Sequence, residues 1–233
     1  MQPTPVTPGR LKACSHLCCL FHSIDEKHRT VAAFVAEGLE RSERCVLIAS
    51  PAEQRELHAA LEAAGVSVES ARGRGALVLA TDAETYLRMG RFDPEDSLSL
   101  MEGFVDGAVA DGFRGVRVSG DGSSPLPDHV WADVLRYEAL VNERLARRPF
   151  LGLCRFDAEA VRPDRLEDVL RTHPLVAARG ELCANPFYER PEVVLGADPR
   201  ARVQWRLHQV RAYHRAMKKV AARATGAALP PGR

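Results

Sequence analysis

The chain has 233 residues, of which 45% are hydrophobic and 27% are charged, values typical of a globular protein with a sizeable core. Its formal net charge of +1 gives no overall attraction to nucleic acid or to an anionic membrane. No apolar run approaches the roughly 20 residues that span a bilayer, and residues 1–12 lack the apolar core of a secretory signal. We therefore expect a disordered lead-in over residues 1–12, no membrane partner, a cytoplasmic location and reduced cysteines.

Short apolar runs alternate with longer amphipathic segments along the chain. In chain order they predict a strand at 17–21, a helix at 25–41, a strand at 45–49, a helix at 51–64, a strand at 76–80, a helical turn at 81–89, a helix at 94–112, a strand at 116–119, a helix at 128–147, a strand at 150–156, a helix at 163–172 and an edge strand at 182–183. Ser50-Pro51 predicts a helix start, because Ser caps the first turn and Pro fits its first position. The alternation predicts an α/β fold with a mostly parallel sheet flanked by helices.

The C-terminal segment is basic. Residues 199–223 contain eight Arg or Lys residues and no acid, and Val203, Leu207, Val210 and Met217 recur at helical spacing. We predict one folded domain over residues 13–197, a basic amphipathic helix over 198–224 and a disordered tail over 225–233. The cations that we expect to meet a partner are Arg206, Arg211, Arg215 and Lys218.

Polar residues follow several apolar runs in the second half of the chain. Because open α/β sheets bind ligands at the carboxyl ends of their strands, we expect these residues to form a pocket at that rim. The residues that we expect to bind the ligand are Arg117, Ser119, Glu138, Asn142, Arg155 and Tyr188. The two arginines would meet an anionic or polar group, Glu138 would orient them, and Tyr188 would cover the ligand. The structural alternatives are an ion pair of Arg117 with Glu138 or Asp121, and one that fixes Arg155 at the strand end.

Two further features carry weaker signals. The loop at residues 119–124 is either a flexible crossover or a place where backbone amides approach an anion. His173 directly precedes Pro174, which favours a helix-capping role for His173 over a role as a base or a ligand.

Metal binding and catalysis have little support in the sequence. His16, Cys18 and His22 share one face of the first predicted strand, but alternate strand residues lie about 7 Å apart, too far for several to close one tetrahedron. We therefore expect no metal and no cofactor, with these three as minor candidates. No nucleophile elbow, zinc-protease helix or phosphate loop is present, so we predict a binding protein and not an enzyme.

Taken together, these segments resemble the MEDS domain, the methanogen/methylotroph sensory domain of DcmR-type regulators. The matching segments are His16-Leu-Cys-Cys-Leu-Phe21, Gly38-Leu39, Gly90-Arg-Phe-Asp93, Arg117-Val-Ser-Gly120, Tyr137-Glu-Ala-Leu-Val-Asn142, Leu153-Cys-Arg-Phe-Asp157, His173-Pro174 and Asn185-Pro-Phe-Tyr188. The resemblance implies a RecA-like fold without a phosphate loop and a sensory role toward small organic compounds such as hydrocarbon derivatives. It also implies partners of the transcription, histidine-kinase or anti-sigma type.

We therefore expect a stand-alone sensory domain that binds a small organic molecule. The basic helix would signal to a regulatory protein or mediate dimerisation. One alternative is a nucleic-acid-binding regulator that acts through this helix with salt-sensitive affinity. A further alternative is a residual nucleotide-binding enzyme, against which the missing phosphate-loop Lys weighs.

Overall fold

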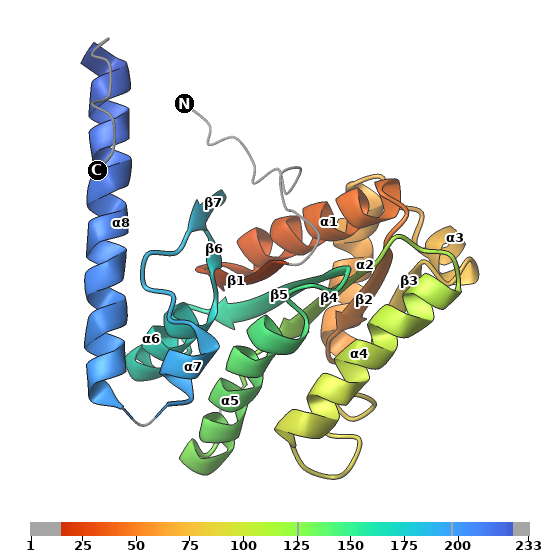
Figure 1. The fold of residues 1–233 in the computed structure, drawn as a ribbon. Helices are drawn as coiled ribbons and strands as arrows, with labels where there is room; N and C mark the ends of the chain where they lie inside the picture. Colours follow the sequence, from red (N-terminus) through yellow and green to blue (C-terminus); the bar gives the residue numbers. More distant parts are fainter. Residues whose placement is uncertain (1–14, 125, 197, 226–233) are drawn as a thin grey trace.

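A seven-stranded sheet forms the centre of the computed structural model, which describes residues 15–124, 126–196 and 198–225 (Figure 1). The strands lie in the order β3-β2-β4-β5-β1-β6-β7. Their bounds are β1 Ser15–Phe21, β2 Arg44–Ile48, β3 Leu77–Ala80, β4 Val116–Asp121, β5 Phe150–Asp157, β6 Leu175–Ala178 and β7 Glu181–Ala184. Every pair is parallel except β6 with β7, so the carboxyl ends of β1 to β6 lie along one edge.

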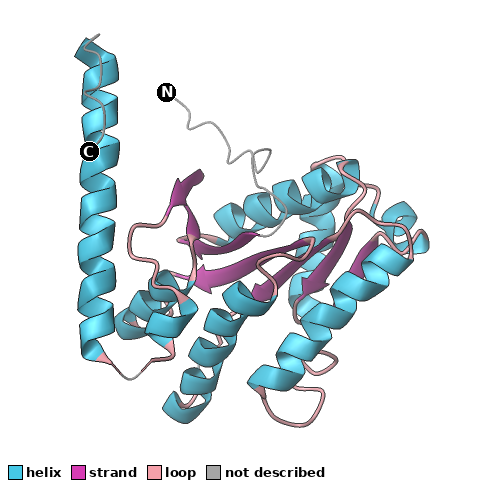
Figure 2. Cartoon of the chain, viewed as in Figure 1, coloured by secondary structure: helices cyan, strands magenta, loops and turns pink. Residues whose placement is uncertain are grey.

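Helices cover both faces of the sheet (Figure 2). Their bounds are α1 Ile24–Glu40, α2 Pro51–Ala63, α3 Val68–Gly73, α4 Pro94–Ala110, α5 Asp128–Arg144, α6 Pro163–Thr172, α7 Pro191–Val194 and α8 Pro199–Thr225. The first three pack on one face, and α4 and α5 pack on the other. Successive strand side chains point to opposite faces. In β5, Leu151 and Leu153 therefore join the α1 side of the core, whereas Phe150 joins the α5 side.

The predicted fold class is confirmed: the chain is an α/β protein with a mostly parallel, helix-flanked sheet and a C-terminal helix. The Ser50 hydroxyl caps α2 as predicted, accepting from the Glu53 N–H at 3.2 Å. Residues 82–89 form turns in place of the predicted helical turn. Three short elements, α3, β6 and α7, lie outside the predictions, because runs of 6, 4 and 4 residues carry too little periodicity.

The 27-residue helix α8 runs along one side of the domain and contacts it near its start (Figure 1). The Trp205 indole N–H donates to the Tyr188 carbonyl at 2.6 Å, and Arg202 Nε lies 3.3 Å from a Glu189 carboxylate oxygen. The predicted lead-in over residues 1–12, and all of the predicted tail except Thr225, lie outside the described residues. Within the described ranges, no helix has the length and apolarity to cross a membrane.

Candidate functional site

A cavity of about 350 Å³ opens at the carboxyl ends of β4 and β5, on the face that α4 and α5 cover. Its walls are mainly apolar, and its aromatic lining residues are Tyr86, Phe92, Trp131, Tyr137 and Phe156. Tyr137 lies edge-on to Tyr86 and Phe92, with ring centroids 5.9 and 5.8 Å away. The volume lies at the lower end of the range for sites that bind small molecules.

The charged groups on the cavity wall are mostly acidic. Asp82, Asp121 and Glu138 contribute carboxylates, whereas Arg91 contributes the single cation among the described lining residues. The pKa of Asp82 is raised, mainly by burial and also by the nearby Asp121 carboxylate. The cavity therefore suits an apolar molecule with a hydrogen-bond donor better than it suits an anion.

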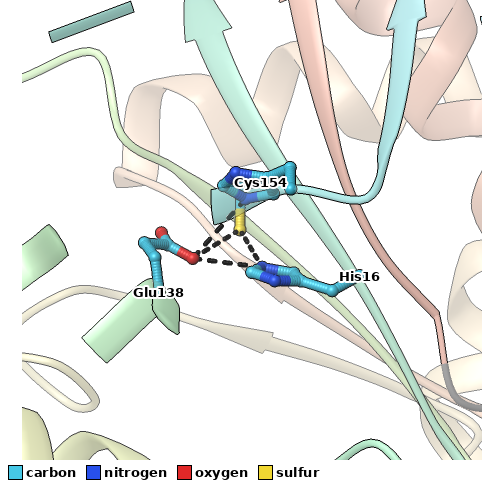
Figure 3. Close-up of side chains that lie close together, drawn as sticks. His16, Glu138 and Cys154 are labelled. Carbon is cyan, nitrogen blue, oxygen red and sulfur yellow. Dashed lines mark hydrogen bonds and ion pairs between the residues drawn. The ribbon is translucent and has the colours of Figure 1, made fainter. Parts of the chain in front are cut away.

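Glu138 and Cys154 of the cavity wall also belong to a buried cluster with His16 and His173. Figure 3 shows Glu138, Cys154 and His16 of this cluster. The four residues come from α5, β5, β1 and the C-cap of α6, respectively. One ligand atom from each of them lies within 4.8 Å of the others. The cluster therefore joins four elements that are far apart in the sequence.

Strand pairing explains why His16 reaches this cluster. His16 lies opposite Gly152 in the parallel β1–β5 ladder, two residues before the Cys18–Cys154 pair. A Cβ atom on Gly152 would lie 3.1 Å from His16 Cδ2, so glycine leaves room for the imidazole ring. The ring thereby extends toward α5, where Glu138 and Asn142 lie one helical turn apart.

The Glu138 carboxylate is the centre of the cluster (Figure 3). Its Oε2 atom lies 3.0 Å from His16 Nε2 and 3.5 Å from His173 Nε2, and it accepts from the Cys154 thiol at 3.7 Å. His16 Nε2 lies 3.3 Å from the Cys154 sulfur. The His16 and His173 rings are in contact, with centroids 4.1 Å apart.

Burial and neighbouring charges set the protonation of the cluster. Burial alone raises the pKa of Glu138, but the His16 hydrogen bond and the electrostatic interactions with His173 and His16 bring it below its ordinary value. Burial, followed by the charge on His16, lowers the pKa of His173 to about 3. Burial and then the Glu138 carboxylate raise the pKa of the Cys154 thiol well above its ordinary value. At neutral pH the cluster thus holds an anionic Glu138, a neutral His173 and a protonated thiol.

One family model matches the part of the chain that carries this cluster. The family model described as MEthanogen/methylotroph, DcmR Sensory domain matches residues 15–174, which carry all four cluster residues. The chain belongs to the MEDS family. The resemblance seen in the sequence is confirmed, and the MEDS domain of this chain is a sensory domain. No curated protein matches the chain.

The structure places the predicted ligand residues of the MEDS domain on two faces of the sheet. Arg117 lies on the α1 side, where its Nε donates to Glu43 at 2.5 Å and its Nη1 to Glu37 at 3.2 Å. The predicted pairing of Arg117 with Glu138 or Asp121 is therefore wrong. Glu138 lies in α5, on the opposite face of the sheet. Asp121 leaves β4 on the same face as Arg117, but its carboxylate lies 3.5 Å from Lys27 of α1. Arg117 does not line the cavity described above.

Ser119 and Arg155 also lie on the α1 side and contact each other. Arg155 Nη1 donates to the Ser119 hydroxyl at 3.1 Å, and Nη2 donates to the Ile48 carbonyl at 3.0 Å. Arg155 Nη2 lies 3.3 Å from a Glu53 carboxylate oxygen. Arg155 thus forms a structural ion pair, which was the stated alternative to a role in ligand binding.

Asn142 and Tyr188 have different neighbours. Asn142 supports the cluster, because its Oδ1 lies 3.3 Å from His16 Nδ1. Tyr188 lies at a second cavity, of about 710 Å³, between α6 and α8. Of the six predicted ligand residues, the structure brings together Glu138 and Asn142, and places Tyr188 beside the C-terminal helix.

The three minor metal candidates from the first strand lie in different surroundings. His16 belongs to the cluster, whereas Cys18 is buried with its sulfur 3.8 Å from the Leu175 carbonyl oxygen. His22 is exposed and lies 3.0 Å from Glu159. His173 caps α6 as predicted, and it also faces the cluster.

The partners of His16 escape sequence reasoning. Cys154 reads as a small apolar residue of a buried strand, and His173 as a cap. The signal that would find them is strand order: β1 lies between β5 and β6, so residues of β1, β5 and the turn before β6 become neighbours.

Proposed function

We propose that this MEDS domain binds a small, largely apolar molecule with one hydrogen-bond donor in the cavity beside Glu138. The observation that carries the proposal is the pairing of an aromatic cavity with one buried, ionised carboxylate on its wall. A neutral alcohol or amine would donate to Glu138 and bury its hydrocarbon part among the aromatic rings. An anion would meet three carboxylates and a single lining cation, Arg91, whose Nη2 already lies 3.6 Å from Asp93.

We propose a binding role for the domain in place of catalysis. The Cys154 thiol is a poor nucleophile, because burial and the Glu138 carboxylate disfavour its thiolate. The His173 ring is fixed by its contact with the Val169 carbonyl at 2.8 Å. The five described cysteines are unpaired, which fits action in the reducing cytoplasm.

Calorimetric titration with three probes of similar size tests this proposal. We expect benzyl alcohol to bind more tightly than toluene, and toluene more tightly than benzoate. The variant Val134→Phe narrows the cavity and should weaken binding of benzyl alcohol at least tenfold. Val109→Phe, on the exposed side of α4, is the matched control and should bind like the wild type. Tightest binding of benzoate, or unchanged binding to Val134→Phe, would contradict the proposal.

A chain of contacts supports signalling from this site to α8. The Asn185 side-chain amide donates to the His173 carbonyl at 2.7 Å, and Asn185 begins the turn that contains Tyr188. The Tyr188 carbonyl accepts from Trp205 of α8 at 2.6 Å. A ligand that moves His173 would thereby act on the base of α8, provided that it binds two arrangements with different affinity.

The exposed face of α8 supports a partner contact. Val203, Val210 and Met217 are exposed at seven-residue spacing, as are Tyr213 and Val220. The predicted partner cations Arg211, Arg215 and Lys218 are exposed, while Arg206 Nε lies 3.5 Å from Glu189. Two such basic helices would repel each other. We therefore propose an acidic helix of a regulatory protein as the partner.

A photoreactive residue in place of Val210, crosslinked in cells, should capture an acidic helical segment. Self-association is the competing outcome, measured by sedimentation velocity of the full chain. The nucleic-acid alternative rests on the same cations and predicts salt-sensitive binding of a labelled DNA duplex. Either result in place of the acidic segment would overturn the choice of partner.

A further inference from the structure

We propose that His16, Glu138, Cys154 and His173 form a binding site for one zinc ion. The four residues offer two imidazole nitrogens, one thiolate sulfur and one carboxylate oxygen, all of which are ligands that zinc accepts. The inference goes beyond the proposed function, and it does not depend on an organic ligand in the cavity.

The spacing of the four atoms fits a tetrahedral ion. Bonds of about 2.1 Å to nitrogen or oxygen and about 2.3 Å to sulfur place tetrahedral ligand atoms roughly 3.3 to 3.6 Å apart. The Glu138 oxygen lies 3.0 Å from the His16 nitrogen, 3.5 Å from the His173 nitrogen and 3.7 Å from the Cys154 sulfur. The separations within the cluster extend to 4.8 Å, so the side chains would have to move closer together for all four atoms to enter one coordination shell.

The surroundings of His16 direct a nitrogen lone pair into the cluster. The Asn142 amide nitrogen donates to the carbonyls of Glu138 and Thr172, at 2.9 and 2.6 Å. This fixes the Asn142 oxygen as the atom that faces His16 Nδ1, at 3.3 Å. That oxygen only accepts, so Nδ1 carries a proton, and Nε2, which faces Glu138 and Cys154, is the His16 nitrogen available to a metal ion.

His173 is oriented in the same way. Its Nδ1 lies 2.8 Å from the Val169 carbonyl oxygen, which accepts the ring proton. The Nε2 lone pair then points at Glu138 Oε2 and has no hydrogen-bond partner among the described residues. The His173 side chain is 0% exposed, so bulk solvent does not reach this atom. Metal-bound histidines typically donate their other ring N–H to a carbonyl or carboxylate in this manner.

A bound cation would relieve an unfavourable contact between these groups. Without one, the His173 lone pair faces the Glu138 carboxylate at 3.5 Å, so that two hydrogen-bond acceptors meet in a buried space. A divalent ion with the Glu138 carboxylate and the Cys154 thiolate makes a site of zero net charge, which suits its burial. Mixed nitrogen and sulfur ligands favour zinc over magnesium or calcium, which prefer oxygen ligands.

The test uses the tag-free full chain, purified without chelators and then given zinc or cobalt alone. Native mass spectrometry should show one zinc ion per chain, lost when the protein is denatured. Cobalt should give visible bands of a tetrahedral ion and a near-ultraviolet thiolate-to-cobalt band. Both measurements use the wild type, so they can refute the proposal even if a variant does not fold.

Two cysteine variants locate the site. Cys154→Ser should weaken zinc binding at least tenfold and abolish the thiolate band. Cys18→Ser removes a buried thiol from the same face of the sheet and should retain both signals. The proposal fails if the wild type binds no stoichiometric zinc, if the cobalt complex lacks the thiolate band, or if Cys154→Ser binds zinc like the wild type. In those cases the cluster is a His16–Glu138 ion pair, and the organic-ligand titrations decide the proposed function separately.

Discussion

Replacing Arg117 by methionine tests whether this arginine stabilises the fold or binds the ligand. The Arg117 side chain is 0% exposed, and its guanidinium lies 5.1 Å from the Phe34 ring centroid. It donates to the Phe34 carbonyl at 2.9 Å and to Glu43 at 2.5 Å. Methionine fills a similar volume but removes the charge, so the 16% exposed Glu43 side chain loses this cation.

The expected cost follows from this burial. Removing one partner of a buried ion pair costs about 3–5 kcal/mol, because the other charge stays desolvated. For a domain of this size, about 1 kcal/mol shifts Tm by roughly 2–4 °C, so Arg117→Met should lower Tm by about 6–20 °C. Adding Glu43→Gln removes the unpaired charge and should recover part of the loss.

Urea denaturation followed by circular dichroism measures the free energy of unfolding. Arg144→Met is the control, because Arg144 pairs with Glu102 at 2.6 Å with its side chain 34% exposed, and such pairs contribute about 0–1 kcal/mol. A loss below about 1 kcal/mol for Arg117→Met would refute the structural role, because a desolvated ion pair would cost more. Loss of benzyl alcohol binding at unchanged stability would instead assign Arg117 to the ligand.

Other measurements test separate parts of the structure. Gly115→Ala should destabilise the protein by about 1–3 kcal/mol in urea denaturation, because the new Cβ atom would lie 2.5 Å from the Pro149 carbonyl oxygen. Gly103→Ala, in open space on α4, should stabilise it by about 0.5–1 kcal/mol in the same assay, and equal effects of the two variants would contradict this account. Iodoacetamide at neutral pH should modify exposed Cys183 and spare Cys45, because burial raises the pKa of the Cys45 thiol to about 12. Peptide mass mapping identifies the labelled residues, and rapid labelling of Cys45 would disprove its burial.

The sequence predicts the fold better than the site, for a physical reason. Strands and helices leave periodic signals over five or more residues, and the cap at Ser50 is local chemistry, so these predictions are confirmed. The site depends on which strands become neighbours and on which face each residue leaves. Arg155 and Cys154 are adjacent in sequence, yet they face α2 and α5 on opposite sides of the sheet. A step of one residue along β5 therefore moves a side chain from a structural ion pair on one face of the sheet to the cavity wall on the other face.

A small rotation of α8 where it is attached to the domain would give a large displacement of its far end. The helix is held near residues 202–209, and the part from 210 to 225 extends about 24 Å beyond that hold at 1.5 Å per residue. A rotation of about 10° at the hold would carry the far end through about 4 Å over that length. If α8 contacts a partner as we propose, a change at His173 too small to alter the sheet would move the far end of the helix by about this distance. In such a rotation α8 would move as one helix about its contact with the Tyr188 turn.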